Sequence, residues 1–233
     1  MVSSVKVSLV NTASFHHNNR MTFNHSPNES ICLIILLSGR GSNFKAIHQA
    51  VLDGTIPNTT IGLVISNKPD APGLAWAKDQ GLNTLALPKQ PDESREAYDQ
   101  RLVKAIQPHQ PDWLVLAGYN RILTDDFIHA FEGKILNIHP SLLPKFGGPG
   151  MVGLKVHQAV IEAGETESGC TVHGVTTIVD GGPILGQRTV PVLPDDTAET
   201  LAARVLEQEH QLYPAVLKKL VLPSTAHPIA DKL

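Results

Sequence analysis

An amide, an imidazole and a carboxylate stand where they could act together on an acyl group. Asn137 and His139 belong to the run NIHPSLLP at 137–144, and Asp180 begins Asp-Gly-Gly. An asparagine amide can donate a hydrogen bond to a developing oxyanion, and a histidine can stabilise that charge and transfer a proton. A nearby aspartate raises the pKa of a histidine and fixes its orientation. These residue types predict transfer of an acyl group to an amine.

A glycine-rich turn, SGRGSN at 38–43, offers a binding site for a phosphate. It follows an apolar run and precedes a predicted helix, so backbone N–H groups and the helix N-terminus can face an anion. The turn lacks the Gly-Lys-Ser/Thr ending of a Walker A loop, and Phe44 replaces the third glycine of a dinucleotide fingerprint. It indicates a phosphorylated substrate, with a plain strand–helix connection as the alternative.

Each further candidate also has a structural interpretation. His139 could be a satisfied polar residue at a strand end, and Asp180 a turn former. Arg95 and Arg121 could bind carboxylates of an anionic cofactor or lie on the surface. Glu209 could meet a substrate ammonium or hydroxyl, or belong to an exposed helix face.

Composition narrows the class of protein. The 233 residues are 42% hydrophobic and 18% charged, as expected for one globular domain with a real core. A net charge of −3 gives no electrostatic reason to expect nucleic acid or an anionic membrane as partner. No apolar run is long enough to span a bilayer, which needs roughly 18 residues.

Neither a metal nor a disulfide is predicted. Cys32 and Cys170 sit in separate apolar runs, and there is no HExxH pattern. His173 could be core or lie behind the site, and His157 is expected to be structural. Two unpaired cysteines favour a reducing, cytoplasmic setting.

Apolar runs alternate with helical segments along the chain. Strands are predicted at 31–37, 61–65, 84–87, 113–116 and 135–138, with helices over about 42–53, 74–80 and 93–107. This order predicts a mostly parallel, Rossmann-like open α/β sheet with helices on both faces. Later runs at 171–179 and 186–192 predict an antiparallel C-terminal strand pair. Asp196 with Glu199 is expected to open a long terminal helix in capping-box fashion.

The predicted sheet brings the polar segments to one edge. Ligands of open α/β sheets bind beyond the carboxyl ends of the strands. Segments 38–43, 66–68, 118–121 and 137–140 all follow such ends.

The chain divides into three parts. Residues 1–30 are rich in Ser, Asn and His and are predicted to be a disordered leader. A start at Met21 and an organelle transit peptide are the alternatives. Residues 31–222 form the predicted domain, and 223–233 a tail.

From about Ile31 to Leu220 the chain resembles the phosphoribosylglycinamide formyltransferase family. The matching runs are SGRGSN at 38–43, ISNKPDAPGLAWA at 65–77, SREAYD at 94–99, LAGYNRIL at 116–123, NIHPSLLPKF at 137–146, VDGGPIL at 179–185 and EHQLYP at 209–214. The NIHPSLLPKF run is specific to folate-type formyltransferases, and SGRGSN narrows the resemblance to the glycinamide ribonucleotide enzymes.

The resemblance implies a role for each candidate residue. Asn137 binds the formyl group, His139 is the catalytic acid, and Asp180 keeps His139 protonated near neutral pH. The ribonucleotide is bound by Gly41, Ser42, Asn43 and Glu209. The folate is bound by Arg95, Asn120, Arg121, Ile122, Leu123 and Asn137.

Two positions depart from the family pattern. Asn120 stands where a methionine is common, and Val152 where many relatives have an aromatic residue.

The expected reaction moves a formyl group from 10-formyltetrahydrofolate to the amine of glycinamide ribonucleotide, in de novo purine biosynthesis and without a metal. The alternatives are a formyltetrahydrofolate hydrolase, a formyltransferase for another amine, and a non-catalytic folate- or nucleotide-binding protein. A monomer and a homodimer are both compatible with the sequence.

Overall fold

The computed structural model describes residues 7–8 and 30–222. The predicted tail at 223–233 lies outside these residues, as does the predicted leader apart from Val7, Ser8 and Ser30.

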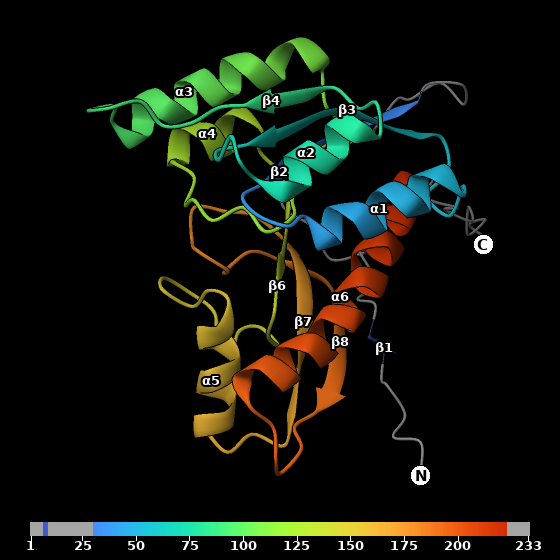
Figure 1. Ribbon diagram of the computed structural model, residues 1–233, viewed down its shortest axis with the longest axis vertical. Coiled ribbons are helices and arrows are strands. Elements are labelled where there is room, and N and C mark those ends of the chain that lie inside the picture. The colour runs from blue at the N-terminus through green and yellow to red at the C-terminus, as the bar shows by residue number, and fades with distance from the viewer. Residues whose placement is uncertain (1–6, 9–29, 223–233) are drawn as a thin grey trace, which may run out of the picture.

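A single mixed sheet organises the chain (Figure 1), with strand order β1-β8-β7-β6-β5-β2-β3-β4. Its strands are β1 (Val7–Ser8), β2 (Ile31–Leu37), β3 (Thr59–Ser66), β4 (Thr84–Ala86), β5 (Trp113–Leu116), β6 (Ile135–His139), β7 (Glu167–Gly174) and β8 (Ile184–Pro191). The pairs from β6 through β5 and β2 to β4 are parallel, whereas β7 and β8 run antiparallel to their neighbours. The predicted fold class is confirmed.

Helices cover both faces of this sheet (Figure 1). They are α1 (Ser42–Leu52), α2 (Pro72–Asp79), α3 (Arg95–Ile106), α4 (Asp125–Ala130), α5 (Leu154–Glu162) and α6 (Ala198–Val221), with a 3-10 turn at Gln107–His109. Successive side chains of a strand point to opposite faces. Leu33 and Ile35 therefore join the core under α1, α2 and α6, whereas Ile34 and Leu36 join the core under α3 and α4.

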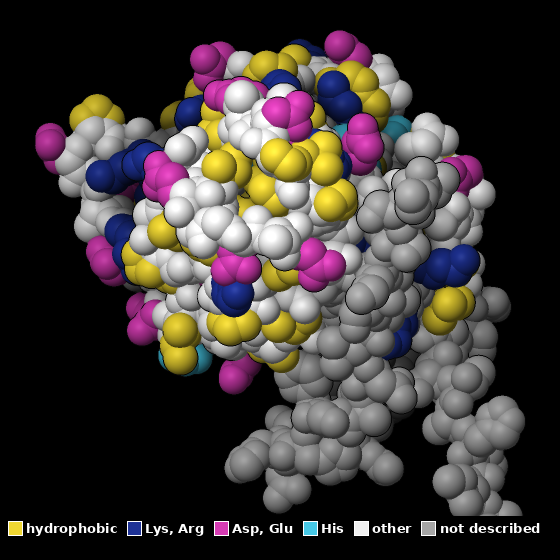
Figure 2. Space-filling model, turned by 90° about the horizontal axis from the view of Figure 1, so that it is seen from below, with side chains coloured by type: hydrophobic (Ala, Val, Ile, Leu, Met, Phe, Trp, Pro, Cys, Tyr) yellow, Lys and Arg dark blue, Asp and Glu magenta, His cyan; other side chains and the backbone are white. Residues whose placement is uncertain are grey.

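The surface mixes side chains of both charges. On the face turned toward the viewer in Figure 2, acidic and basic groups alternate with apolar ones. No helix among the described residues is long and apolar enough to cross a membrane.

Two predicted boundaries were wrong. The strand expected at 171–179 is β7, which ends at Gly174 because the following residues fold into a turn closed by Gly181 N donating to Ile178 O (3.0 Å). The helix α6 is capped by Thr197 and Thr200, whose side chains accept from each other's backbone N–H. Asp196 instead pairs with Arg204 (2.7 Å), four residues beyond the capping box.

The turn after β2 is packed tightly against α2. A Cβ atom added to Gly73 would lie 2.9 Å from Gly39 O and 3.1 Å from the Gly41 Cα. Gly41 itself has a φ of +69°, in the left-handed region that favours glycine. The two glycines let α2 support the polar turn directly.

We expect Gly73→Ala to lower the free energy of unfolding by about 1–3 kcal/mol, because the added methyl meets rigid backbone. Gly39→Ala is the matched control, since a Cβ there meets nothing within 4 Å. Urea denaturation of both variants measures the difference. Equal stability of the two would contradict the close packing of α2 on the turn.

Candidate active site

The polar residues predicted to carry the chemistry lie at the carboxyl ends of β2, β3, β5 and β6, or they contact residues at these ends.

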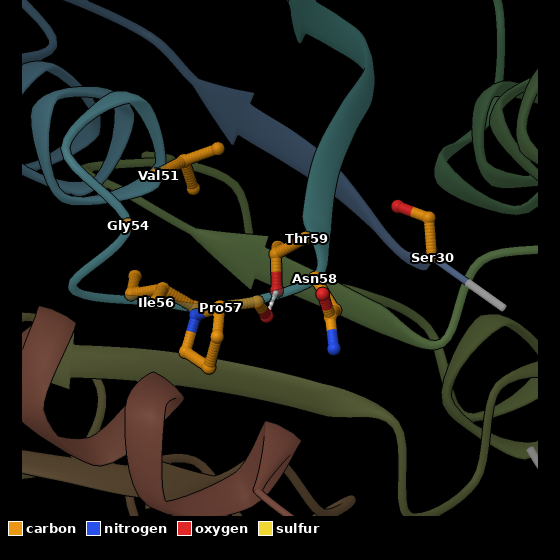
Figure 3. Close-up of a pocket in the computed structure, with 7 residues that line it drawn as sticks. All are labelled: Ser30, Val51, Gly54, Ile56, Pro57, Asn58 and Thr59. Atoms are coloured by element: carbon orange, nitrogen blue, oxygen red, sulfur yellow. Dashed lines mark hydrogen bonds between the residues drawn. The ribbon is translucent and has the colours of Figure 1, made fainter. Parts of the chain in front are cut away.

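Two surface hollows lie at the opposite edge of the sheet. The first, of about 320 Å³, is lined by Ser30, Val51, Gly54, Ile56, Pro57, Asn58 and Thr59 (Figure 3). None of these side chains is ionisable, and Thr59 Oγ1 donates to Pro57 O (2.8 Å). The second, of about 470 Å³, adjoins the starts of β5 and β6. Neither hollow offers the chemistry found at the carboxyl edge.

His139, at the end of β6, lies between a carbonyl and a carboxylate. Its side chain is buried, with Nε2 2.8 Å from Phe146 O and Nδ1 3.5 Å from Asp180 Oδ2. A carbonyl only accepts, so Nε2 carries a hydrogen. In the neutral ring Nδ1 therefore carries no hydrogen, and its lone pair faces the Asp180 carboxylate. Protonation of Nδ1 would convert this contact into a charge-assisted hydrogen bond.

The burial of His139 opposes that protonation. Burial lowers the pKa of His139, while the Asp180 carboxylate and the Phe146 carbonyl act in the opposite direction, and the net shift is downward. The effect of Asp180 has the predicted sign. The net direction runs against a protonated resting ring, because the lost hydration of the imidazolium is the larger effect.

Asp180 remains the ionised partner. Burial alone would raise its pKa, but His173, the Gly148 N–H and the His139 charge together lower it. The Gly148 N–H donates to Asp180 Oδ2 (2.9 Å). The resting site therefore pairs a carboxylate with a largely neutral imidazole.

Both partners of His139 have strained backbones, as do three non-glycine residues elsewhere in the described part of the chain. Phe146 has a φ of +55° and Asp180 a φ of +54°, a region that costs a non-glycine residue of order 1–3 kcal/mol. Between them, a Cβ on Gly147 would lie 2.5 Å from Leu143 Cδ2 and 3.2 Å from Asp180 Cβ. The loop after β6 thus approaches Asp180 closely enough to fix both groups around His139.

Asn137 is oriented by His173 on the neighbouring strand. The two residues are Cα partners in the β6–β7 pair, and Asn137 Nδ2 lies 3.2 Å from His173 Nε2. His173 Nδ1 donates to Gly174 O (2.9 Å), and Nε2 faces both the Asn137 amide and Asp180 Oδ1, 3.6 Å away. In the tautomer with Nε2 unprotonated, this nitrogen accepts from the amide. One Asn137 N–H is used in this way, and the other can meet an oxyanion.

Asn43 and Glu209 form a second polar group. The Asn43 Nδ2 donates to Glu209 Oε2 (2.6 Å), and both side chains are buried. Burial raises the pKa of Glu209, which the Asn43 hydrogen bond partly offsets. Asn43 Oδ1 has no hydrogen-bond partner among the described residues. Since Gly41 and Ser42 begin α1 beside it, the predicted ribonucleotide residues do come together.

A third group surrounds Tyr98 on α3. The Arg121 guanidinium lies 3.9 Å from the Tyr98 ring centroid, and Arg95 Nη2 contacts Leu123 O (3.5 Å). Leu123 is buried, whereas Ile122 is 49% exposed. Arg121 Nε is buried with no partner among the described residues. These residues bring two cations and an exposed apolar side chain together around Tyr98 and Leu123.

Two contributors were not predicted. The Phe146 carbonyl and the Gly148 N–H are backbone groups, which carry no residue signature. For His173 the sequence allowed a place in the core or behind the site, and its pairing with Asn137 follows from the register of β6 and β7. No group of three His, Cys, Asp or Glu within the described ranges could hold a metal ion.

This arrangement defines a class of enzyme. Asn137 has an amide that can donate to an oxyanion, His139 a titratable ring, and Asp180 a fixed negative charge. The Asn43–Glu209 pair and the Tyr98 group are two further polar groups of the site. Such a site on an open α/β sheet suits group transfer between two bound substrates.

The chain belongs to the formyl transferase family, whose model matches residues 32–217, and the resemblance predicted from the sequence is confirmed. It is 44% identical over 185 residues to the phosphoribosylglycinamide formyltransferase of Escherichia coli (strain K12), covering 79% of this chain and 84% of that protein. It is 45% identical over 188 residues to a chloroplastic phosphoribosylglycinamide formyltransferase of Vigna unguiculata, covering 81% of this chain and 60% of that protein.

A solved structure of the phosphoribosylglycinamide formyltransferase from Brucella melitensis is 46% identical, with a TM-score of 0.76 and coverage of 84% of this chain and 97% of that one. The chain spans 60% and 63% of the length of two plant relatives. Its likeness to the bacterial proteins is nearly full-length.

We expect the His139 imidazole to titrate below its ordinary value of about 6.5. In Asp180→Asn its pKa should fall further, because the shape is kept and the opposing charge is lost. NMR titration of the ring carbons measures both values, with the signal assigned by its loss in His139→Gln. A rise of the pKa in Asp180→Asn would contradict the electrostatic role of Asp180.

Proposed function

We propose that this chain transfers a formyl group from 10-formyltetrahydrofolate to the primary amine of glycinamide ribonucleotide. The observation that carries the proposal is the contact of His139 with Asp180 beside the His173-oriented amide of Asn137. The names of the bacterial relatives support this pair of substrates. A similar protein named trifunctional purine biosynthetic protein adenosine-3 supports a place in purine biosynthesis.

The ribonucleotide binds at the start of α1. The backbone N–H groups of Gly41, Ser42 and Asn43 face its phosphate, where the helix N-terminus favours an anion. Glu209 is held by Asn43 and accepts hydrogen bonds from hydroxyl groups of the substrate. The primary amine extends from there toward His139.

The folate binds beside the Tyr98 group. Arg95 and Arg121 pair with its carboxylates, and the exposed Ile122 covers part of its ring. The backbone of Asn120 and Leu123 borders the same space. Asn137 contacts the formyl oxygen, so it belongs to both the folate site and the catalytic group.

The chemistry is a direct transfer. The neutral amine nitrogen attacks the formyl carbon, and the carbonyl electron pair moves to oxygen. Asn137 donates its remaining N–H to this oxyanion, and the His139 Nε2–H turns from Phe146 O toward it. As negative charge develops, a solvent proton binds the ring at Nδ1, and Asp180 stabilises the resulting imidazolium on that side. The ring returns this proton to solvent when the oxyanion collapses to the new carbonyl. The bond from carbon to the folate N10 then breaks, and an amine hydrogen passes to N10.

Two other functions predict different outcomes. A formyltetrahydrofolate hydrolase would use water in place of the amine at the same residues. A binding protein would take up folate or nucleotide without turnover. The Asn43–Glu209 pair favours the transferase, because a hydrolase has no need of a second polar subsite.

The cell compartment and assembly are also proposals. Cys32 and Cys170 are free thiols, which supports a reducing compartment and agrees with a cytoplasmic enzyme. A monomer and a homodimer are both compatible with the proposed site.

The direct test is a turnover assay with 10-formyltetrahydrofolate, with and without glycinamide ribonucleotide. Deformylation that requires the ribonucleotide and yields its formyl derivative is the expected result. Deformylation without the ribonucleotide would favour the hydrolase, and binding of both compounds without turnover would favour the binding protein.

We expect Asn137→Ala and His139→Ala each to lower kcat by roughly 100- to 1,000-fold, the usual loss for an oxyanion donor. The matched controls are Asn83→Ala and His129→Ala, which change exposed residues away from the site. Thermal denaturation confirms that each variant is folded. Near-normal turnover in either site variant would remove that residue from the mechanism.

A further inference from the structure

Three polar side chains join the carboxyl ends of β2, β3 and β5. Ser38 Oγ donates to Asn67 Oδ1 (2.6 Å), Asn67 Nδ2 donates to Asn120 Oδ1 (3.0 Å), and the Asn120 backbone N–H donates to Ser38 Oγ (2.9 Å). The sheet order changes direction between β2 and β5, where ligands of open α/β sheets bind. The three residues therefore bridge the crevice at which a substrate is expected.

The hydrogen bonds fix which way the Asn120 amide faces. A backbone N–H only donates, so Ser38 Oγ accepts from Asn120 and gives its own hydrogen to Asn67 Oδ1. Asn67 then donates from Nδ2, and the Asn120 side chain accepts with Oδ1. No described residue accepts a hydrogen bond from Asn120 Nδ2, and its two N–H groups belong to an exposed side chain.

The side chain of Asn120 is directed differently from those of its two neighbours. Tyr119 and Arg121 both contact Tyr98, through a hydroxyl pair at 3.1 Å and a guanidinium 3.9 Å from the ring centroid. Asn120, between them, turns to Ser38 and Asn67 instead. Its side chain thus lies on the side of the 38–43 turn, away from the Tyr98 group that is proposed to hold the folate.

We propose that Asn120 is a specificity-determining residue for the ribonucleotide, to which its amide donates a hydrogen bond, and that Ser38 and Asn67 are the positioning residues that aim it. The ligand group is an acceptor oxygen, either of the phosphate or of the carboxamide. The inference rests on the proposed function for the identity of the substrate. This role of Asn120 differs from the one implied by the family resemblance, which places Asn120 among the folate-binding residues.

Asn120→Leu and Asn120→Asp test the proposal. Leucine keeps the size and removes the donor, whereas aspartate keeps the Asn67 hydrogen bond and presents an acceptor to the ligand. The control is Asn83→Asp, which adds the same charge at an exposed position by β4. Calorimetry measures the Kd for glycinamide ribonucleotide and for ribose 5-phosphate, and kinetics give the KM for 10-formyltetrahydrofolate.

We expect both variants to weaken ribonucleotide binding by roughly 10- to 100-fold, the range for a lost hydrogen bond to a charged group, with the folate KM and the control unchanged. If the binding of ribose 5-phosphate weakens by the same factor, Asn120 contacts the phosphate. If only the binding of the ribonucleotide weakens, Asn120 contacts the carboxamide.

The inference would be overturned if both variants bound the ribonucleotide with a Kd within about twofold of the wild type. It would also be overturned if the variants raised only the KM for 10-formyltetrahydrofolate. Ser38→Ala should also weaken ribonucleotide binding. The variant loses the hydrogen bond from Ser38 Oγ to Asn67, so that the Asn120 amide is no longer oriented although it is still present. A wild-type protein that binds the ribonucleotide without turnover would contradict the proposed function alone.

Discussion

The site depends on the burial of one imidazole between a backbone carbonyl and a carboxylate. His139 is largely shielded from water, and Phe146 O and Asp180 lie against its two ring nitrogens. Burial favours the neutral ring and Asp180 favours the charged one. The balance leaves the ring able to gain charge when an oxyanion appears beside it, which is the moment at which a proton is useful. The strained backbone at both partners shows that the fold holds them there.

The mixed sheet explains how these groups meet. β6 is parallel to β5 and antiparallel to β7, so its carboxyl end joins the edge used by β2, β3 and β5 while its flank pairs directly with His173. The parallel half brings the 38–43 turn and the Tyr98 group. The antiparallel half brings the turn that carries Asp180. The amide of Asn137 is oriented across the junction between the two halves.

Much of this could be predicted from local patterns. Short apolar runs ending in glycine or polar residues located β2, β3, β5 and β6, and a period of two placed Asn137 and His139 on one face. The pairing of Asn43 with Glu209 could not be seen in the sequence without the family resemblance, because 166 positions separate them. The length of β7 was misjudged because Val175 to Val179 has strand-forming residues, yet the approach of Gly182 to Gly174 O requires a turn there. Backbone contributors such as Phe146 O leave no trace in residue types.

The central claim is that Asn137 and His139 act on one oxyanion as a unit. The most direct measurement is kcat for the double variant Asn137→Ala/His139→Ala beside the two single variants. If both groups serve the same charge, the double variant loses little more than the worse single variant. If the fold-loss in kcat of the double variant equals the product of the two single fold-losses, the two residues act independently, which would contradict the account.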